Sequence, residues 1–188
     1  MDVQQVGPGL WRWTVEHPDW KEGADWPRQV GCVYYEAPEE VVLFDPQVPL
    51  ERDRFLAALD RDVARLGRPV AILLTVPWHE RSSEELAERY GARVGGGAAR
   101  VVELPYPELT ETVYWLPEPR TLVVGESLVG GDDGRLALCP AAWLEGKPVA
   151  DVRSVLHPLL DLPVDRVLVS HGEPVLRDGG EALARALA

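Results

Sequence analysis

The most informative stretch of this chain is Val70-Ala71-Ile72-Leu73-Leu74-Thr75-Val76-Pro77-Trp78-His79-Glu80-Arg81. Its first five residues are apolar on both faces, which is typical of a buried central strand. The residues from Thr75 onward predict a loop. A helix follows, because Ser82 or Ser83 supplies an N-cap and Glu85 completes a Ser-x-x-Glu capping box with Ser82. Strand ends that lead into helices are where α/β proteins gather functional loops, so the stretch predicts an α/β fold with a functional loop here.

The elements on either side agree with an α/β fold. Before the stretch, apolar β-branched runs predict strands, and the spacing of Phe55, Leu56, Leu59, Val63 and Leu66 predicts a helix that stops at Gly67. After it, β patterns dominate until a helix strained by Pro158, a last strand and a short closing helix. The predicted strands cover residues 6–15, 30–35, 41–44, 100–104, 112–116, 121–124, 136–138 and 166–170, a turn covers 130–134, and the predicted helices cover 51–66, about 150–160 and the chain end.

Length and charge limit the function. A chain of 188 residues without repeats or linkers predicts a single domain over residues 1–188. The net charge of −12 argues against nucleic acid and anionic membrane surfaces as partners, since both need a positive face. No apolar run reaches the roughly 20 residues that span a bilayer, and the N-terminus lacks the pattern of a secretory signal. We therefore expect a cytoplasmic protein, with a small molecule as the candidate partner; the sequence predicts no oligomeric state.

Cysteine and histidine are scarce. Cys32 and Cys139 lie far apart without metal-binding spacing, so we expect free thiols. Of the four histidines, the one beside Pro18 falls in a long loop and His157 falls within a predicted helix. The other two, His79 and His171, each directly follow an apolar strand, which makes them the candidates for chemistry.

The order of these motifs resembles that of the metallo-β-lactamase superfamily over nearly the whole chain. The motifs that carry the resemblance are a strand ending in Leu43-Phe44-Asp45, the loop of residues 76–81 before a capped helix, the later Gly125-Glu126-Ser127-Leu128, and the strand end Ser170-His171-Gly172. The resemblance implies an αββα four-layer sandwich, with two mixed β-sheets and outer helices. It also implies a binuclear metal site along one edge, bound by a His-x-His-x-Asp-His loop and later ligands.

The motifs depart from the family pattern where the metal would bind. The resemblance puts Val76, Trp78 and Arg81 at the three histidine positions of the loop and Glu80 at its aspartate. It puts His79 at a position that the family does not use as a ligand. The later ligands fall as follows: the histidine near Glu108, the bridging aspartate on Glu126, and the last histidine on His171, the only one kept.

The first interpretation is a degenerate metal centre. Neither Val76 nor Trp78 can bind a metal, and Arg81 places a fixed positive charge where a cation would lie. We expect Arg81 to pair with a carboxylate (Glu80, Glu108 or Glu126) and the protein to hold no cofactor. It would then be a hydrolase-like pseudoenzyme or a small-molecule binder, with Trp78, Arg81 and Glu108 lining the pocket.

The alternative is a rebuilt site for one metal ion. His79, Glu126 and His171, with Glu80 or Glu108, would supply nitrogen and oxygen ligands suited to zinc, iron or manganese. Such an ion would acidify water for attack on an ester, thioester or phosphate-like bond, with Glu80 as the catalytic base.

Two further hypotheses use other residues. Gly125-Glu126-Ser127 half-resembles a nucleophile elbow, and Ser127, Asp161 or Asp165, and His171 follow the order of an α/β-hydrolase, but the second glycine of that motif is missing. Separately, Trp78 with Trp20 and Trp26 would make an aromatic-walled pocket for a small ligand in a binding protein.

Overall fold

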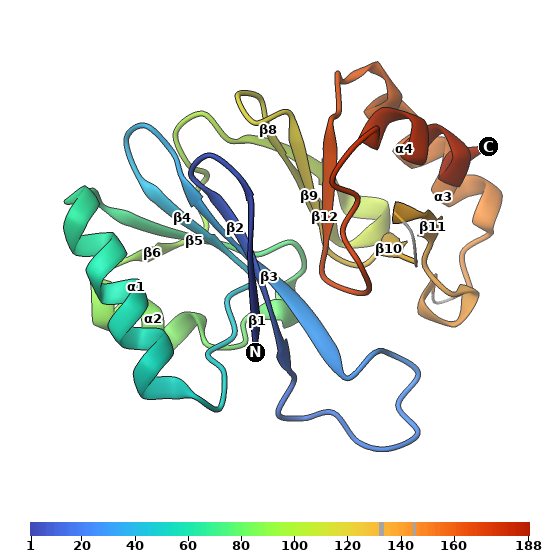
Figure 1. Ribbon diagram of the computed structural model, residues 1–188. Helices are drawn as coiled ribbons and strands as arrows, with labels where there is room; N and C mark the ends of the chain where they lie inside the picture. Colours follow the sequence, from blue (N-terminus) through green and yellow to red (C-terminus); the bar gives the residue numbers. More distant parts are fainter. Residues whose placement is uncertain (132–133, 145) are drawn as a thin grey trace. The chain divides into compact units, whose positions relative to one another are not determined.

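The computed structural model describes residues 1–131, 134–144 and 146–188 (Figure 1). Two residues of the turn expected over 130–134 therefore lie outside the described residues. The chain forms two compact units. The first unit comprises Met1–Leu74 and Trp78–Val101, and the second comprises Thr75–Pro77 and Val102–Ala188.

A six-stranded mixed sheet forms the first unit, in the order β1-β2-β3-β4-β5-β6. Strands β1 to β4 pair antiparallel, whereas β4, β5 and β6 pair parallel. The single strand region expected over 6–15 is in fact a hairpin, because Gly9 takes a positive φ of 66° and turns the chain between β1 and β2. The strands are β1 (Asp2–Gly7), β2 (Leu10–Glu16), β3 (Gln29–Glu36), β4 (Val41–Phe44), β5 (Val70–Leu73) and β6 (Arg93–Val94).

Helices α1 (Arg52–Leu66) and α2 (Ser83–Tyr90) lie against one face of this sheet (Figure 1). They bury Phe55, Leu56, Leu59 and Leu86 against apolar strand residues, which include Leu43 and Ile72. Helix α1 ends at Gly67 in the left-handed conformation, as the sequence predicted.

The capping box predicted for α2 is wrong. Ser82 is the N-cap residue, but its side chain makes no cap hydrogen bond. Its Oγ atom instead accepts the backbone N–H of Val48 (2.9 Å) and lies 3.1 Å from Nε2 of Gln47. Glu85 forms an ion pair with Arg52 of α1. Both side chains are used to fasten the start of α2 to segments that precede it in the chain.

A four-stranded mixed sheet forms the second unit, in the order β12-β9-β8-β7. Its outer pair β12 and β9 is parallel, and the other pairs are antiparallel. A separate two-stranded ribbon joins β10 to β11. The strands are β7 (Val102–Tyr106), β8 (Glu111–Leu116), β9 (Thr121–Val124), β10 (Leu128–Gly130), β11 (Leu136–Leu138) and β12 (Arg166–Val169).

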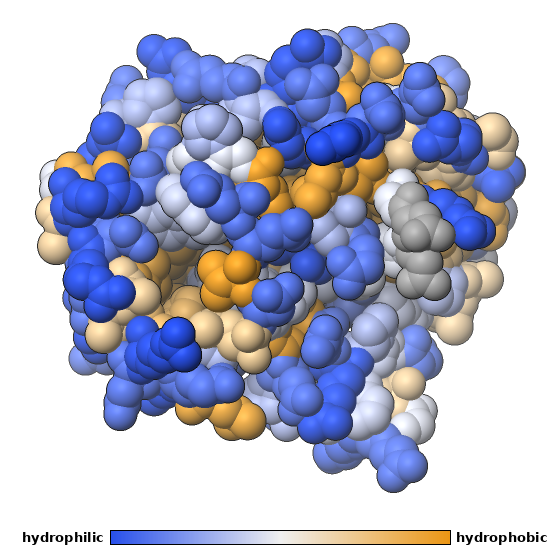
Figure 2. All heavy atoms as spheres, viewed as in Figure 1, coloured by the Kyte–Doolittle hydropathy of each residue, from blue (hydrophilic) through white to orange (hydrophobic). Residues whose placement is uncertain are grey.

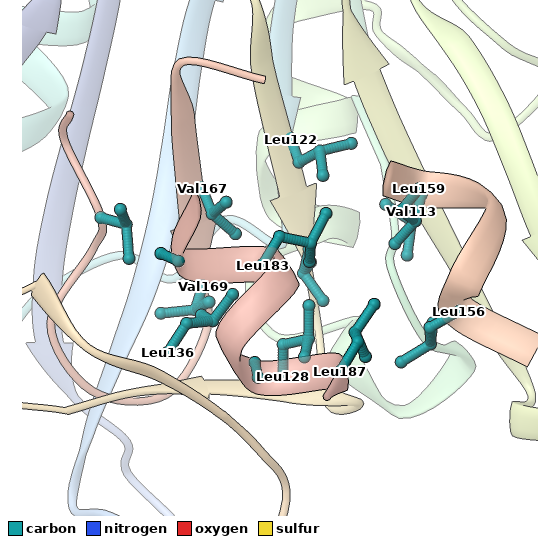
Figure 3. Close-up of a cluster of buried hydrophobic side chains, with 14 of the residues drawn as sticks. Val113, Leu122, Leu128, Leu136, Leu156, Leu159, Val167, Val169, Leu183 and Leu187 are labelled. Carbon is teal, nitrogen blue, oxygen red and sulfur yellow. The ribbon is translucent and has the colours of Figure 1, made fainter. Parts of the chain in front are cut away.

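The core of the second unit joins its strands to α3 (Val149–Leu156) and α4 (Gly179–Leu187) (Figure 3). Leu183 of α4 lies near Val167 and Leu122 of the sheet, and Leu187 lies beside Leu128 of β10. The helix expected over about 150–160 changes at His157 into a 3₁₀ segment, η5 (His157–Asp161). Pro158 explains the change, because proline removes an α-helical hydrogen bond.

Each unit therefore pairs a mixed sheet with helices, which confirms the predicted α/β class with two mixed sheets. The face in Figure 2 is largely hydrophilic, with small separate hydrophobic groups. Among the described residues, no helix is long and apolar enough to span a membrane. The single domain over 1–188 and the cytoplasmic location stay predictions.

Candidate functional site

The first unit holds a buried imidazole–carboxylate pair. Asp45 follows β4 with a positive φ of 46°, and its N–H donates to the carbonyl of Leu73 (3.1 Å). His79 ends the 3₁₀ turn η1 (Pro77–His79), and its Nδ1 atom lies 3.0 Å from Oδ2 of Asp45. Because an ionised carboxylate only accepts hydrogen bonds, Asp45 places the ring proton on Nδ1 of His79. The same arrangement orients histidines that bind a metal through Nε2.

Arg81 is fixed beside this pair. Its Nη1 atom donates to the carbonyl oxygens of Asp45 (2.8 Å) and Gly31 (3.0 Å) and lies 3.6 Å from Sγ of Cys32. Arg81 has a positive φ of 44°, which turns the loop back toward these strand ends. The predicted pairing of Arg81 with Glu80 is wrong, because the hydrogen bonds of the guanidinium to described residues all come from Nη1 and go to backbone carbonyls and Sγ of Cys32, while Glu80 is exposed.

The other loop residues differ in their exposure. Trp78 is 58% exposed and Glu80 is exposed, whereas Val76 is buried. Trp20 donates its ring N–H to the carbonyl of Trp26 (2.9 Å), so these two tryptophans brace their own long loop. A cavity of about 700 Å³ is lined by Trp20 but not by Trp26 or Trp78, which differs from the predicted pocket of all three.

The second unit holds another imidazole–carboxylate pair. Nε2 of His171 lies 3.3 Å from Oε1 of Glu126. His171 is buried just after β12, and Glu126 is half-buried between β9 and β10. The ring of Trp143 packs edge-on against the imidazole, with centroids 5.1 Å apart. Glu126 and His171 are thus brought together, as the one-metal hypothesis requires of them.

Close backbone packing positions His171. The N–H of Gly130 donates to the carbonyl of His171 (2.9 Å). A Cβ atom on Gly172 would lie 1.9 Å from the carbonyl oxygen of Gly130, and one on Gly130 would lie 1.7 Å from that of Glu173. Gly172 also has a φ of 84°. Only glycine fits either position, so the loop after β12 is held against β10.

Glu111 organises the loop that carries Glu126. Its buried carboxylate accepts the N–H groups of Gly125 (2.7 Å), Glu126 (3.2 Å) and Ser127 (3.0 Å). Burial raises the pKa of Glu111, and these hydrogen bonds oppose that rise. The family motif pointed to Glu108 in place of this residue, but Glu108 is exposed in η2 (Pro107–Leu109). The available signal was an acidic residue at the start of an apolar strand.

The nucleophile-elbow hypothesis is wrong. An elbow needs a helix directly after its serine, because the helix supports the strained turn. Ser127 is followed instead by strand β10, and Asp165 forms an ion pair with Arg120.

Comparisons with solved structures give the fold. The chain matches a metallo-β-lactamase from Hirschia baltica with a TM-score of 0.65 and 13% identity, covering 99% of this chain and 95% of that one. A metallo-β-lactamase from Erythrobacter litoralis, with β-mercaptoethanol in its active site, matches with a TM-score of 0.61 and 16% identity, covering 98% of this chain and 93% of that one. A metallo-β-lactamase from Pseudomonas aeruginosa in its mono-zinc form matches with a TM-score of 0.60 and 12% identity, covering 99% of this chain and 94% of that one.

The chain therefore has the metallo-β-lactamase fold, as the sequence predicted. No family model and no curated protein matches its sequence. The donors found within the units are imidazole nitrogen and carboxylate oxygen, which suit zinc, iron or manganese.

Proposed function

We propose that this chain is a hydrolase-like protein of the metallo-β-lactamase fold whose metal centre is degenerate. It binds a small molecule and does not carry out two-metal hydrolysis. The observation that carries this proposal is the position of Arg81 in the loop. Its guanidinium donates a hydrogen bond to the carbonyl oxygen of Asp45 (2.8 Å). Arginine stays protonated at any working pH, so the loop carries a permanent positive charge.

The other replacements support the same conclusion. A catalytic zinc needs three protein ligands, and a two-metal site needs more. In the loop aligned by resemblance, Val76 is buried and apolar, and Trp78 is exposed with no metal-binding atom. The loop therefore lacks side chains that can bind a metal at two of the three histidine positions of the family pattern, and the charge of Arg81 at the third disfavours a cation nearby.

The charge of Arg81 can be tested directly. We expect Arg81→Gln to tighten zinc binding on the order of tenfold, measured by competition with a chromophoric chelator, because it removes a like charge. Arg68→Gln is the matched control, since Arg68 also donates to a backbone carbonyl in the first unit, that of Ala37 (2.8 Å). Equal zinc affinity in the two variants would remove the main support for the proposal.

Activity gives a second test. Zinc-supplemented protein would be assayed with a chromogenic β-lactam, a p-nitrophenyl ester, a thioester and a phosphodiester, with His171→Ala as the control. We expect no turnover above that control. Turnover that needs two equivalents of zinc and is lost in His171→Ala would contradict the proposal.

The second candidate function is hydrolysis of an ester, thioester or phosphate-like bond with one metal ion bound by His79, Glu126 and His171. Two observations favour it. The carboxylate of Asp45 contacts Nδ1 of His79, as carboxylates do with the histidines that bind a metal through their other nitrogen. Oε1 of Glu126 and Nε2 of His171 lie 3.3 Å apart. A bound ion would supply Lewis-acid chemistry, Asp45 would orient His79, and exposed Glu80 would move the proton.

Elemental analysis separates the two candidates. The protein would be purified without chelator or histidine tag, beside His79→Ala, Glu126→Gln and His171→Ala. About one equivalent of zinc, iron or manganese, lost in all three variants, would establish the one-metal site. Loss in Glu126→Gln and His171→Ala alone would exclude His79 as a ligand, and a folded, metal-free protein would exclude the hypothesis.

A further inference from the structure

A groove in the first unit has no part in the candidate metal centre. It lies between helix α1 and the face of the sheet formed by β1, β2 and β3, with a volume of about 430 Å³. None of its lining residues belongs to the loop of residues 75–81. Its lining includes the aromatic residues Trp11, Trp13, Tyr34 and Phe55, together with Arg54, Ala58 and Arg61 of helix α1.

Aromatic rings form the wall of this groove. Trp11 of β2 lies opposite Tyr34 of β3 in the strand register. Their rings pack edge to face, with centroids 5.4 Å apart. Trp13, two residues along β2, points to the same face and packs against Phe55 of α1 at 5.5 Å. Paired aromatic side chains of this kind are fixed in position and offer flat apolar surface for stacking.

Helix α1 supplies the other side of the groove. Arg54, Ala58 and Arg61 are spaced four and three residues apart, so they share one face of the helix. Ala58 is small and half-buried, and it leaves the space that a larger side chain would fill. The groove thus has an apolar middle with an arginine on each side of it along the helix.

Charge sets these two arginines apart from their neighbours. On the same helix, Arg52 pairs with Glu85, and Arg65 pairs with Glu36 and Asp62. Over residues 1–131, 134–144 and 146–188, neither Arg54 nor Arg61 has an ion pair or hydrogen bond. One acidic residue, Asp62, also lines the groove, and it pairs with Arg65. The two exposed guanidinium groups of Arg54 and Arg61 outnumber it, so the groove is complementary to an anion.

We propose that this groove binds a small planar apolar molecule that carries one anionic group, such as an aromatic carboxylate or sulfonate. The ring of the ligand stacks among Trp11, Trp13 and Phe55, and its anionic group lies between Arg54 and Arg61. This binding site is separate from the proposed degenerate metal centre and does not depend on it.

The test uses two dyes of similar shape. The anionic dye is 8-anilino-1-naphthalenesulfonate, and the neutral dye is N-phenyl-1-naphthylamine. Binding would be followed by dye fluorescence, on proteins whose folding is checked by circular dichroism. We expect saturable binding of the anionic dye, weakened at least tenfold in the double variant Arg54→Glu/Arg61→Glu. The neutral dye should bind that variant as it binds the parent protein.

Two further variants complete the design. Arg153→Glu reverses the charge of an exposed residue of α3 in the second unit, and we expect it to leave the binding of both dyes unchanged. Ala58→Trp fills the groove and should weaken both dyes. Equal binding of the anionic dye by the double variant and by Arg153→Glu would overturn the proposal, as would unchanged binding of both dyes by a folded Ala58→Trp.

Discussion

Nδ1 of His79 lies 3.0 Å from Oδ2 of Asp45, and both side chains are buried. The two residues are 34 positions apart, and the contact ties the loop after β5 to the end of β4. Without its acceptor, the ring N–H of the buried imidazole would be left unsatisfied, and this would lower the stability of the fold. The contact therefore stabilises the protein whether or not a metal binds.

A double-mutant cycle measures how much the contact between Asp45 and His79 stabilises the protein. With Asp45→Ala, His79→Ala and the double variant, we expect a coupling free energy of about 1–3 kcal/mol from urea unfolding without added metal. Strain from alanine at the positive φ of residue 45 enters both the single and the double variant and cancels. Additive effects of the two changes would show that the contact does not stabilise the protein.

Glu111 should matter more than its exposed neighbour Glu108. Glu111→Gln leaves one acceptor oxygen for three N–H groups and brings an NH₂ donor against them, so we expect a loss of about 1.5–3 kcal/mol in the free energy of unfolding. Glu108→Gln in η2 should change it by less than about 0.5 kcal/mol. Similar effects of the two variants would contradict the role assigned to Glu111.

The two thiols should be unreactive in the folded protein. Cys32 and Cys139 are free and buried, as the sequence predicted. Burial raises the pKa of both thiols, that of Cys139 to about 11, with the nearby Glu111 and Glu126 carboxylates adding to the rise. A thiol-reactive disulfide reagent at pH 8 should therefore label neither cysteine until denaturant is added. Rapid labelling of the native protein would show that at least one thiol is accessible.

Asp60 should give the α1–α2 contact a pH dependence. Hydrogen bonds from Arg89, with a further one from Tyr90, lower the pKa of Asp60 from 3.8 to about 2. A lowered pKa means stabilisation that is complete above the ordinary pKa and disappears as the pH falls through the folded value. The stability advantage over Asp60→Asn should therefore be full at pH 7 and shrink from about pH 4 toward pH 2. An advantage that does not change with pH would argue against the ion pair.

The elements that the sequence predicted are those with local signals. The apolar run 70–74 with its following loop, and Gly67 after α1, identify a strand and a helix end from neighbouring residues alone. The hairpin at Gly9 was missed because the residues on both sides of the turn continue the same strand pattern. The sequence predicts a local cap at Ser82, but its hydroxyl accepts a hydrogen bond from the backbone N–H of Val48, 34 positions away.

The candidate site was predicted in part for the same reason. His79, Glu126 and His171 could be chosen because they follow strands or fit the family motif. Asp45 and Glu111 act through contacts with residues 34 and 14 to 16 positions away, and no local pattern indicates such contacts. Arg81 was expected to find a carboxylate, yet backbone carbonyls at the strand ends accept its hydrogen bonds.

The number of metal ions that the folded chain binds is the sharpest test of a degenerate metal centre. Native mass spectrometry of zinc-saturated, buffer-exchanged protein would count them, with His171→Ala measured in parallel. A degenerate centre predicts fewer than two zinc ions on the parent protein. Two zinc ions bound to the folded parent, and lost together in His171→Ala, would contradict the account.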